Sequence, residues 1–131
     1  MSPLVGLLTF LGLTLLLLGG VVATGYAARR RRHIALVVLA MGSLVTTIWF
    51  AEKLGTTYDL EAAGWIYPVH LCLAKTTTAC YLLPLVLGPL TIRKPELLPW
   101  HRRAAYLALG LTGVSAVTGT WMLLAAEPLA R

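Results

Sequence analysis

Three histidines, His33, His70 and His101, are the residues best suited to metal or haem chemistry in this chain. The segments YPVH and LPWH each place a proline two residues before a histidine, and proline is favoured at the first position of a helix. His33 directly follows four arginines. We therefore expect all three in the first turn of a helix, where the partial positive charge favours neutral imidazole. Neutral imidazole is the form that binds a metal or haem iron.

The elements that position these histidines follow from composition. Hydrophobic residues make up 58% of the 131 residues and charged residues 12%, whereas a soluble domain carries about 25% charged residues. Four apolar runs are each long enough, or nearly so, to cross the ~30 Å hydrocarbon layer as a helix. The sequence thus predicts an all-α integral membrane protein. We expect a single up-down-up-down four-helix bundle with helices at residues 3–28, 33–52, 66–92 and 99–126. Pro84 and Pro89 should bend or end the third helix.

The charged residues predict the orientation. Basic residues gather in the first and third connections between helices, at Arg29–Arg32 and at Arg93, Lys94, Arg102 and Arg103. The second connection is net negative. Because lysine and arginine accumulate on the cytoplasmic side, both termini should lie outside. Topology and anionic lipid in the bilayer account for the net charge of +6, and no basic, aromatic face indicates nucleic-acid binding.

Depth in the membrane separates the histidines. The second and fourth helices run in the same direction, so His33 and His101 should lie at one inner level. Two histidines at one depth across a bundle core can bind a haem, of b or a type, as axial ligands. Arg32, Arg102 and Arg103 could then hold the propionates. Copper is the other candidate at this pair. The competing interpretation is that these histidines hold no cofactor and the chain is a structural subunit.

The third helix places His70 near the outer face, too far from the other two histidines to share a centre with them. It is a separate candidate metal ligand. Lys75 lies five residues, about 7.5 Å, deeper. Its ammonium either reaches outward to Glu52 or Glu61 as a structural pair, or lines a polar pocket with residues 76–78 that receives a substrate or quinone. No nucleophile–base–acid grouping is visible, so no independent catalytic activity is expected.

The order of these features resembles a known family. The basic run with its histidine at residues 29–33, IYPVHLCLA at 66–74 and WHRRAAYLALGLTGVSAVTG at 100–119 are similar to the four-helix YozB/CtaM-type membrane proteins, over roughly residues 30–122. The resemblance implies a bacterial inner-membrane protein linked to maturation of haem–copper cytochrome c oxidase, with His33, His70 and His101 as its functional positions. Family members often carry another histidine in the outer loop, and residues 52–64 contain none.

Overall fold

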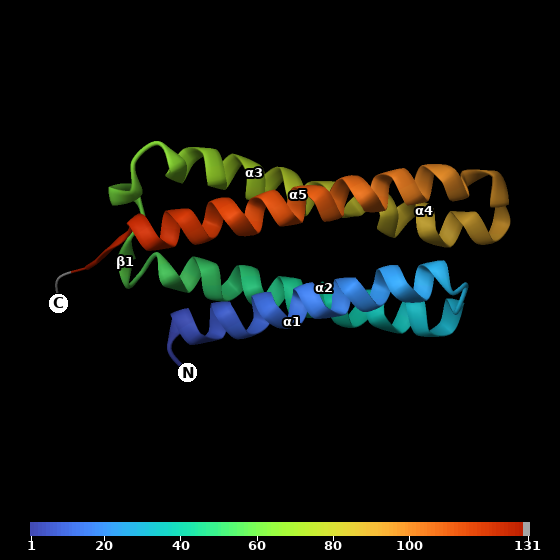
Figure 1. The fold of residues 1–131 in the computed structure, drawn as a ribbon, viewed down its shortest axis with the longest axis horizontal. Coiled ribbons are helices and arrows are strands. Elements are labelled where there is room, and N and C mark those ends of the chain that lie inside the picture. Colours follow the sequence, from blue (N-terminus) through green and yellow to red (C-terminus); the bar gives the residue numbers. More distant parts are fainter. Residues whose placement is uncertain (130–131) are drawn as a thin grey trace. The chain divides into compact units, whose positions relative to one another are not determined.

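The computed structural model describes residues 1–129, which are helical almost throughout (Figure 1). The helices are α1 (Pro3–Tyr26), α2 (Arg30–Leu54), α3 (Ile66–Cys80), α4 (Leu82–Arg93) and α5 (Leu98–Ala125). The shorter elements are the 3-10 helices η1 (Glu61–Ala63) and η2 (Pro95–Leu97) and the paired strands β1 (Tyr58–Asp59) and β2 (Glu127–Pro128). With α3 and α4 counted as one span, the described residues contain four helices long and apolar enough to cross a membrane. The all-helical prediction is confirmed.

The first turn between helices differs from its prediction. Helix α1 ends at Tyr26 and α2 begins at Arg30, so three of the four arginines belong to α2 and His33 is its fourth residue. The chain reverses at Ala28, which has a left-handed backbone with φ 53°. Arginine is a good helix former, so the basic run continues the helix where we expected a loop. Glycine and asparagine are the usual residues in such a conformation, and neither stands at position 28, so the sequence did not mark this turn.

The third span is interrupted at Tyr81, three residues before Pro84. Pro84 has no N–H, so the carbonyl of Cys80 loses its usual partner four residues later. The helix resumes as α4, which continues through Pro89 to Arg93. Pro84 therefore accounts for the expected break, whereas Pro89 does not end the helix.

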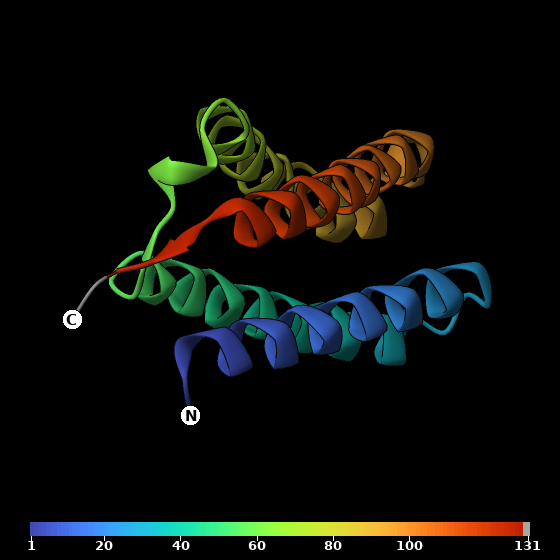
Figure 2. The ribbon, with the colours of Figure 1, turned by 60° about the vertical axis from the view of Figure 1, so that its left-hand side comes forward.

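The chain divides into two compact units. Unit 1 comprises residues 1–58 together with residues 128 and 129, and unit 2 comprises residues 59–127. In unit 1, α1 and α2 form an antiparallel hairpin (Figure 1). In unit 2, α3 and α4 follow one another along α5 and run antiparallel to it (Figure 2). Each unit is consistent with helical-bundle packing, and the single bundle of four spans stays a prediction.

Unit 1 is held together by small residues and hydroxyl groups. The Phe50 ring of α2 lies directly on Gly6 of α1, so that even a methyl group at Gly6 would overlap it. Midway along the hairpin, the buried Thr14 hydroxyl lies 2.8 Å from the Ser43 hydroxyl and 3.3 Å from that of Thr47. Such interhelical hydrogen bonds and close backbone approaches are typical of helix pairs in lipid, where no hydrophobic force drives association.

Unit 2 uses a longer side chain for the same purpose. The Tyr81 hydroxyl lies 2.6 Å from the Thr112 hydroxyl, and both residues are buried. Thr112 donates its own proton to the Ala108 carbonyl at 2.7 Å, so Tyr81 is the donor between them. The tyrosine at the interruption of the third span thus connects that span to α5.

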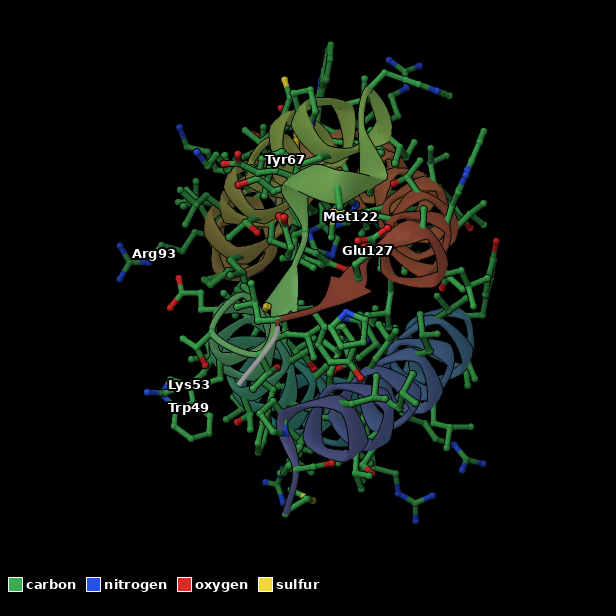
Figure 3. All side chains as sticks on the ribbon, turned by 90° about the vertical axis from the view of Figure 1, so that its left-hand side faces the viewer. Trp49, Lys53, Tyr67, Arg93, Met122 and Glu127 are labelled. Carbon is green, nitrogen blue, oxygen red and sulfur yellow. The ribbon has the colours of Figure 1, made fainter. Side chains whose placement is uncertain are left out.

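The outer surfaces of the helices carry large apolar side chains, such as Leu16 and Leu124, which are 77% and 83% exposed. Lys53 lies over the Trp49 ring at 5.7 Å, and Figure 3 shows these two side chains side by side on α2. Arg103 similarly lies 5.2 Å from the Trp100 ring. Pairs of tryptophan and a cation near helix ends are typical of membrane–water interfaces.

Candidate functional site

All three histidines lie close to the beginning of a helix. His33 and His101 are the fourth residues of α2 and α5, and His70 is the fifth residue of α3. Each side chain is half-buried. Each ring also lies against a glycine of an antiparallel helix in the same unit, a contact that the residue spacing does not predict.

His33 is oriented by α1. Its Nδ1 lies 2.9 Å from the Val21 carbonyl oxygen, which can only accept, so Nδ1 carries the proton. The neutral ring therefore has its lone pair on Nε2. The Thr24 hydroxyl lies farther away, 3.5 Å from Nδ1, and donates to the Gly20 carbonyl at 2.7 Å. A Cβ atom on Gly25 would lie 3.4 Å from His33 Cε1, so the ring packs closely on the glycine backbone.

His70 is oriented by α5 through a side chain instead of a carbonyl. Its Nδ1 lies 3.1 Å from the Thr118 hydroxyl. Thr118 donates its only proton to the carbonyl of Val114 or Ser115, at 3.0 and 3.1 Å, so its oxygen accepts from His70. His70 consequently has the same tautomer as His33, with the lone pair on Nε2. A Cβ atom on Gly119 would lie only 2.8 Å from His70 Cε1.

His101 packs on α4. A Cβ atom on Gly88 would lie 3.3 Å from His101 Cε1, which is tighter than most side-chain contacts. His70 contacts Gly119, which is 18 residues farther along α5 than His101. At 1.5 Å per residue this places the two rings ~27 Å apart along the helix. They lie at opposite ends of unit 2 and cannot bind one metal or haem.

Two of these three contacts share a short sequence pattern, whereas the further Thr-Gly pair at residues 112–113 has nothing within 4 Å of an added Cβ on its glycine. Thr24-Gly25 and Thr118-Gly119 are both Thr-Gly pairs near the C-terminal end of a helix, and each meets a histidine from the first turns of its neighbour. In both pairs the glycine makes room for the ring, and the threonine hydroxyl lies on the Nδ1 side.

The three arginines predicted to hold the haem propionates lie at the surface. Arg32, Arg102 and Arg103 are all exposed near the beginnings of α2 and α5. His33 and His101 belong to different units, so the haem between them stays a prediction.

A small-ion site receives no support within residues 1–129, where no group of three or more histidine, cysteine, aspartate or glutamate side chains could hold a metal. Cys72 is exposed and Cys80 half-buried, and both are free thiols.

The threonines next to Lys75 do not form the polar pocket that was one of its two predicted surroundings. Thr77 is buried, whereas Lys75, Thr76 and Thr78 are exposed, and each threonine hydroxyl donates to a carbonyl of its own helix. Consecutive helical residues point ~100° apart, so these three hydroxyls do not line one pocket. Glu52 is exposed near the end of α2, in the other unit, and its pairing with Lys75 stays a prediction.

Comparison with known proteins adds no relative. No protein-family model, curated protein sequence or solved structure matches this chain. The resemblance to the YozB/CtaM-type family therefore depends on the spaced histidines and their flanking residues alone.

Proposed function

We propose that this chain is a multi-pass protein of the bacterial cytoplasmic membrane, with both termini outside. In our proposal it acts in the assembly of a haem–copper respiratory oxidase such as cytochrome c oxidase, or as its accessory protein. Four long apolar helices support the membrane location, and so do the eight of eleven lysines and arginines that gather at residues 29–32 and 93–103, where consecutive spans meet. The resemblance of residues 30–122 supports the link to the oxidase.

The observation that carries the cofactor part of the proposal is the hydrogen bond of His33. Histidines that bind metals usually donate their other ring N–H to a carbonyl or carboxylate, which fixes the ring and strengthens the ligating nitrogen. His33 Nδ1 donates in this way to Val21 at 2.9 Å, and Nε2 is the nitrogen that would bind.

The donors in this chain suit haem better than a small metal ion. Haem iron needs only one protein ligand on each face, because the porphyrin supplies the other four. Copper or zinc bound by the protein alone usually needs three or four ligands, and residues 1–129 contain no such group. His33 and His101 would hold the haem iron, and the exposed Arg32, Arg102 and Arg103 would pair with its propionates. Bound haem would supply one-electron redox chemistry.

A specific observation also favours the alternative, a structural subunit without a cofactor. Each histidine contacts a glycine of its own unit, and His70 bonds to Thr118. Such contacts alone give the rings a role in holding helices together, with no ligand required.

The test compares three variants with the wild-type protein purified in mild detergent from its native membranes. We expect a Soret band and a reduced α-band in the wild type, lost in His33→Gln and in His101→Gln and retained in His70→Gln, which is the matched control. A wild-type protein without these bands, and without copper by elemental analysis, would overturn the cofactor part and favour the structural subunit. Normal oxidase activity in cells lacking the chain would overturn the link to the oxidase.

A further inference from the structure

The side of α3 that faces away from α5 is unusually polar for a helix in lipid. On the side toward α5, Ile66 and Thr77 are buried and His70 bonds to Thr118. The opposite side is exposed and carries small and polar residues at spacings of three and four, which places them on one face. We call it the α3 outer face, and it consists of Cys72, Lys75, Thr76 and Ala79.

Lys75 brings a positive charge to membrane depth on this face. The span Ile66–Arg93 has 28 residues and is longer than the ~30 Å hydrocarbon layer requires. If the span is centred, the Lys75 Cα atom lies ~8 Å inside the hydrocarbon. The four-carbon stem extends outward by less than ~8 Å, so the ammonium group stays at the edge of the hydrocarbon, where an anionic partner lowers its cost.

Unit 2 offers no anion at that depth. Asp59 accepts hydrogen bonds from the backbone N–H groups of Glu61 and Ala62 at 3.1 and 3.3 Å, beyond the beginning of α3. Lys75 lies nine residues, ~14 Å, from Ile66, and its four-carbon stem covers less than half of that length. Within unit 2, the described residues include no ion pair or hydrogen-bond partner for the Lys75 ammonium.

The sequence has five carboxylate side chains, and none lies in the middle of a span. They are Glu52 near the end of α2, Asp59 and Glu61 before α3, Glu96 in η2 and Glu127 in β2. An anion level with the Lys75 Cα atom therefore has to come from a different molecule, whereas the predicted pair with Glu52 requires the ammonium to reach outward to the end of α2.

We propose that the α3 outer face is a docking surface for a transmembrane helix of another protein, which carries an aspartate or glutamate at the depth of Lys75. The small side chains of Cys72, Thr76 and Ala79 allow a partner helix to approach closely. Exposed sides elsewhere carry large residues such as Leu16 and Val117, which suit lipid. This inference goes beyond the proposed function, because it needs neither a cofactor nor an oxidase.

The test uses a photo-crosslinking residue, p-benzoylphenylalanine, in place of Ala79 in the full chain in native membranes, with adducts identified by mass spectrometry. We expect an adduct to a transmembrane helix that contains an aspartate or glutamate. Lys75→Met should lower its yield at least tenfold, whereas Lys75→Arg should preserve it. Methionine is apolar, so this change does not hinder membrane insertion. Exchanging the charges, with Lys75→Glu and the partner's acid changed to lysine, should restore the adduct.

Two controls match these variants. The same photo-crosslinker in place of Val117, a 67% exposed residue of α5, should react with lipid. Lys53→Met makes the same chemical change at the end of α2 and should leave the position-79 adduct intact. Adducts at position 79 to lipid alone or to a second copy would overturn the proposal, as would a yield insensitive to Lys75→Met or a partner helix without an acid. None of these results depends on the optical spectrum that tests the haem.

Discussion

In unit 1 the middle of the hairpin is held by three small hydroxyl side chains, whereas in unit 2 one tyrosine reaches across to one threonine. Thr14, Ser43 and Thr47 can meet only because α1 and α2 are continuous and closely packed. Tyr81 occupies the interruption between α3 and α4 and bonds to Thr112. Hydrogen bonds fix the register of both helix pairs. In unit 2, where Pro84 interrupts the span, the connecting side chain is the longer tyrosine.

The two units also differ in what covers their tightest glycine. In unit 1 the Phe50 ring covers Gly6 and is itself held between other aromatic rings, stacked 5.7 Å from Phe10 and edge-on 4.8 Å from Trp49. In unit 2 the His70 ring covers Gly119 and is held by one hydrogen bond. The aromatic contact should therefore yield less easily to an added methyl group than the histidine contact.

The largest expected loss of stability comes from substituting Gly6. Gly6→Ala should lower the free energy of unfolding by about 1–3 kcal/mol, because overpacking forces the ring and backbone apart. Gly119→Ala should lower the free energy of unfolding by less, because the His70 ring can move away from position 119 with the loss of one hydrogen bond. Reversible unfolding in mixed micelles measures both.

Matched controls for this prediction are Gly12→Ala on α1 and Gly113→Ala on α5, where an added Cβ meets nothing within 4 Å. Both should be neutral or slightly stabilising, since alanine is the better helix former. If Gly6→Ala were as stable as Gly12→Ala, the seating of Phe50 on α1 would be wrong.

A smaller effect is expected from the hydroxyl groups in the middle of each unit. Interhelical hydrogen bonds in membranes contribute about 0.6 kcal/mol on average. Thr14→Val removes contacts to two hydroxyls and should cost about 1 kcal/mol, while Tyr81→Phe removes one and should cost about 0.6 kcal/mol. Thr120→Val is the control, because Thr120 bonds only to its own helix. An equal cost for Thr120→Val and Thr14→Val would remove the distinction between bonds within and between helices.

The sequence predicts the four long apolar helices well, because each apolar run is long enough to cross a membrane as a helix whatever its partners are. It predicts their ends less well, since α2 begins at Arg30 through a turn at Ala28 that no turn residue marks. The positions of the histidines in early helical turns follow from the neighbouring prolines and arginines. Their partners do not follow, because Thr118 is 48 residues from His70 and only packing brings the two together. The Thr-Gly pairs become meaningful only once the opposing helix is known.

The smallest expected effect is on the tautomers of the His33 and His70 rings. It distinguishes a ring held by a backbone carbonyl from a ring held by a hydroxyl group. Nitrogen NMR of the imidazole rings should show the Nδ1–H tautomer for both His33 and His70. Thr118→Val should make His70 a mixture of tautomers, because it removes the acceptor of its Nδ1 proton. Thr24→Val should leave His33 unchanged, since the Val21 carbonyl at 2.9 Å still accepts that proton. A shift of tautomer in His33 after Thr24→Val would mean that its acceptor is the hydroxyl at 3.5 Å, and both units would then orient histidine in the same way.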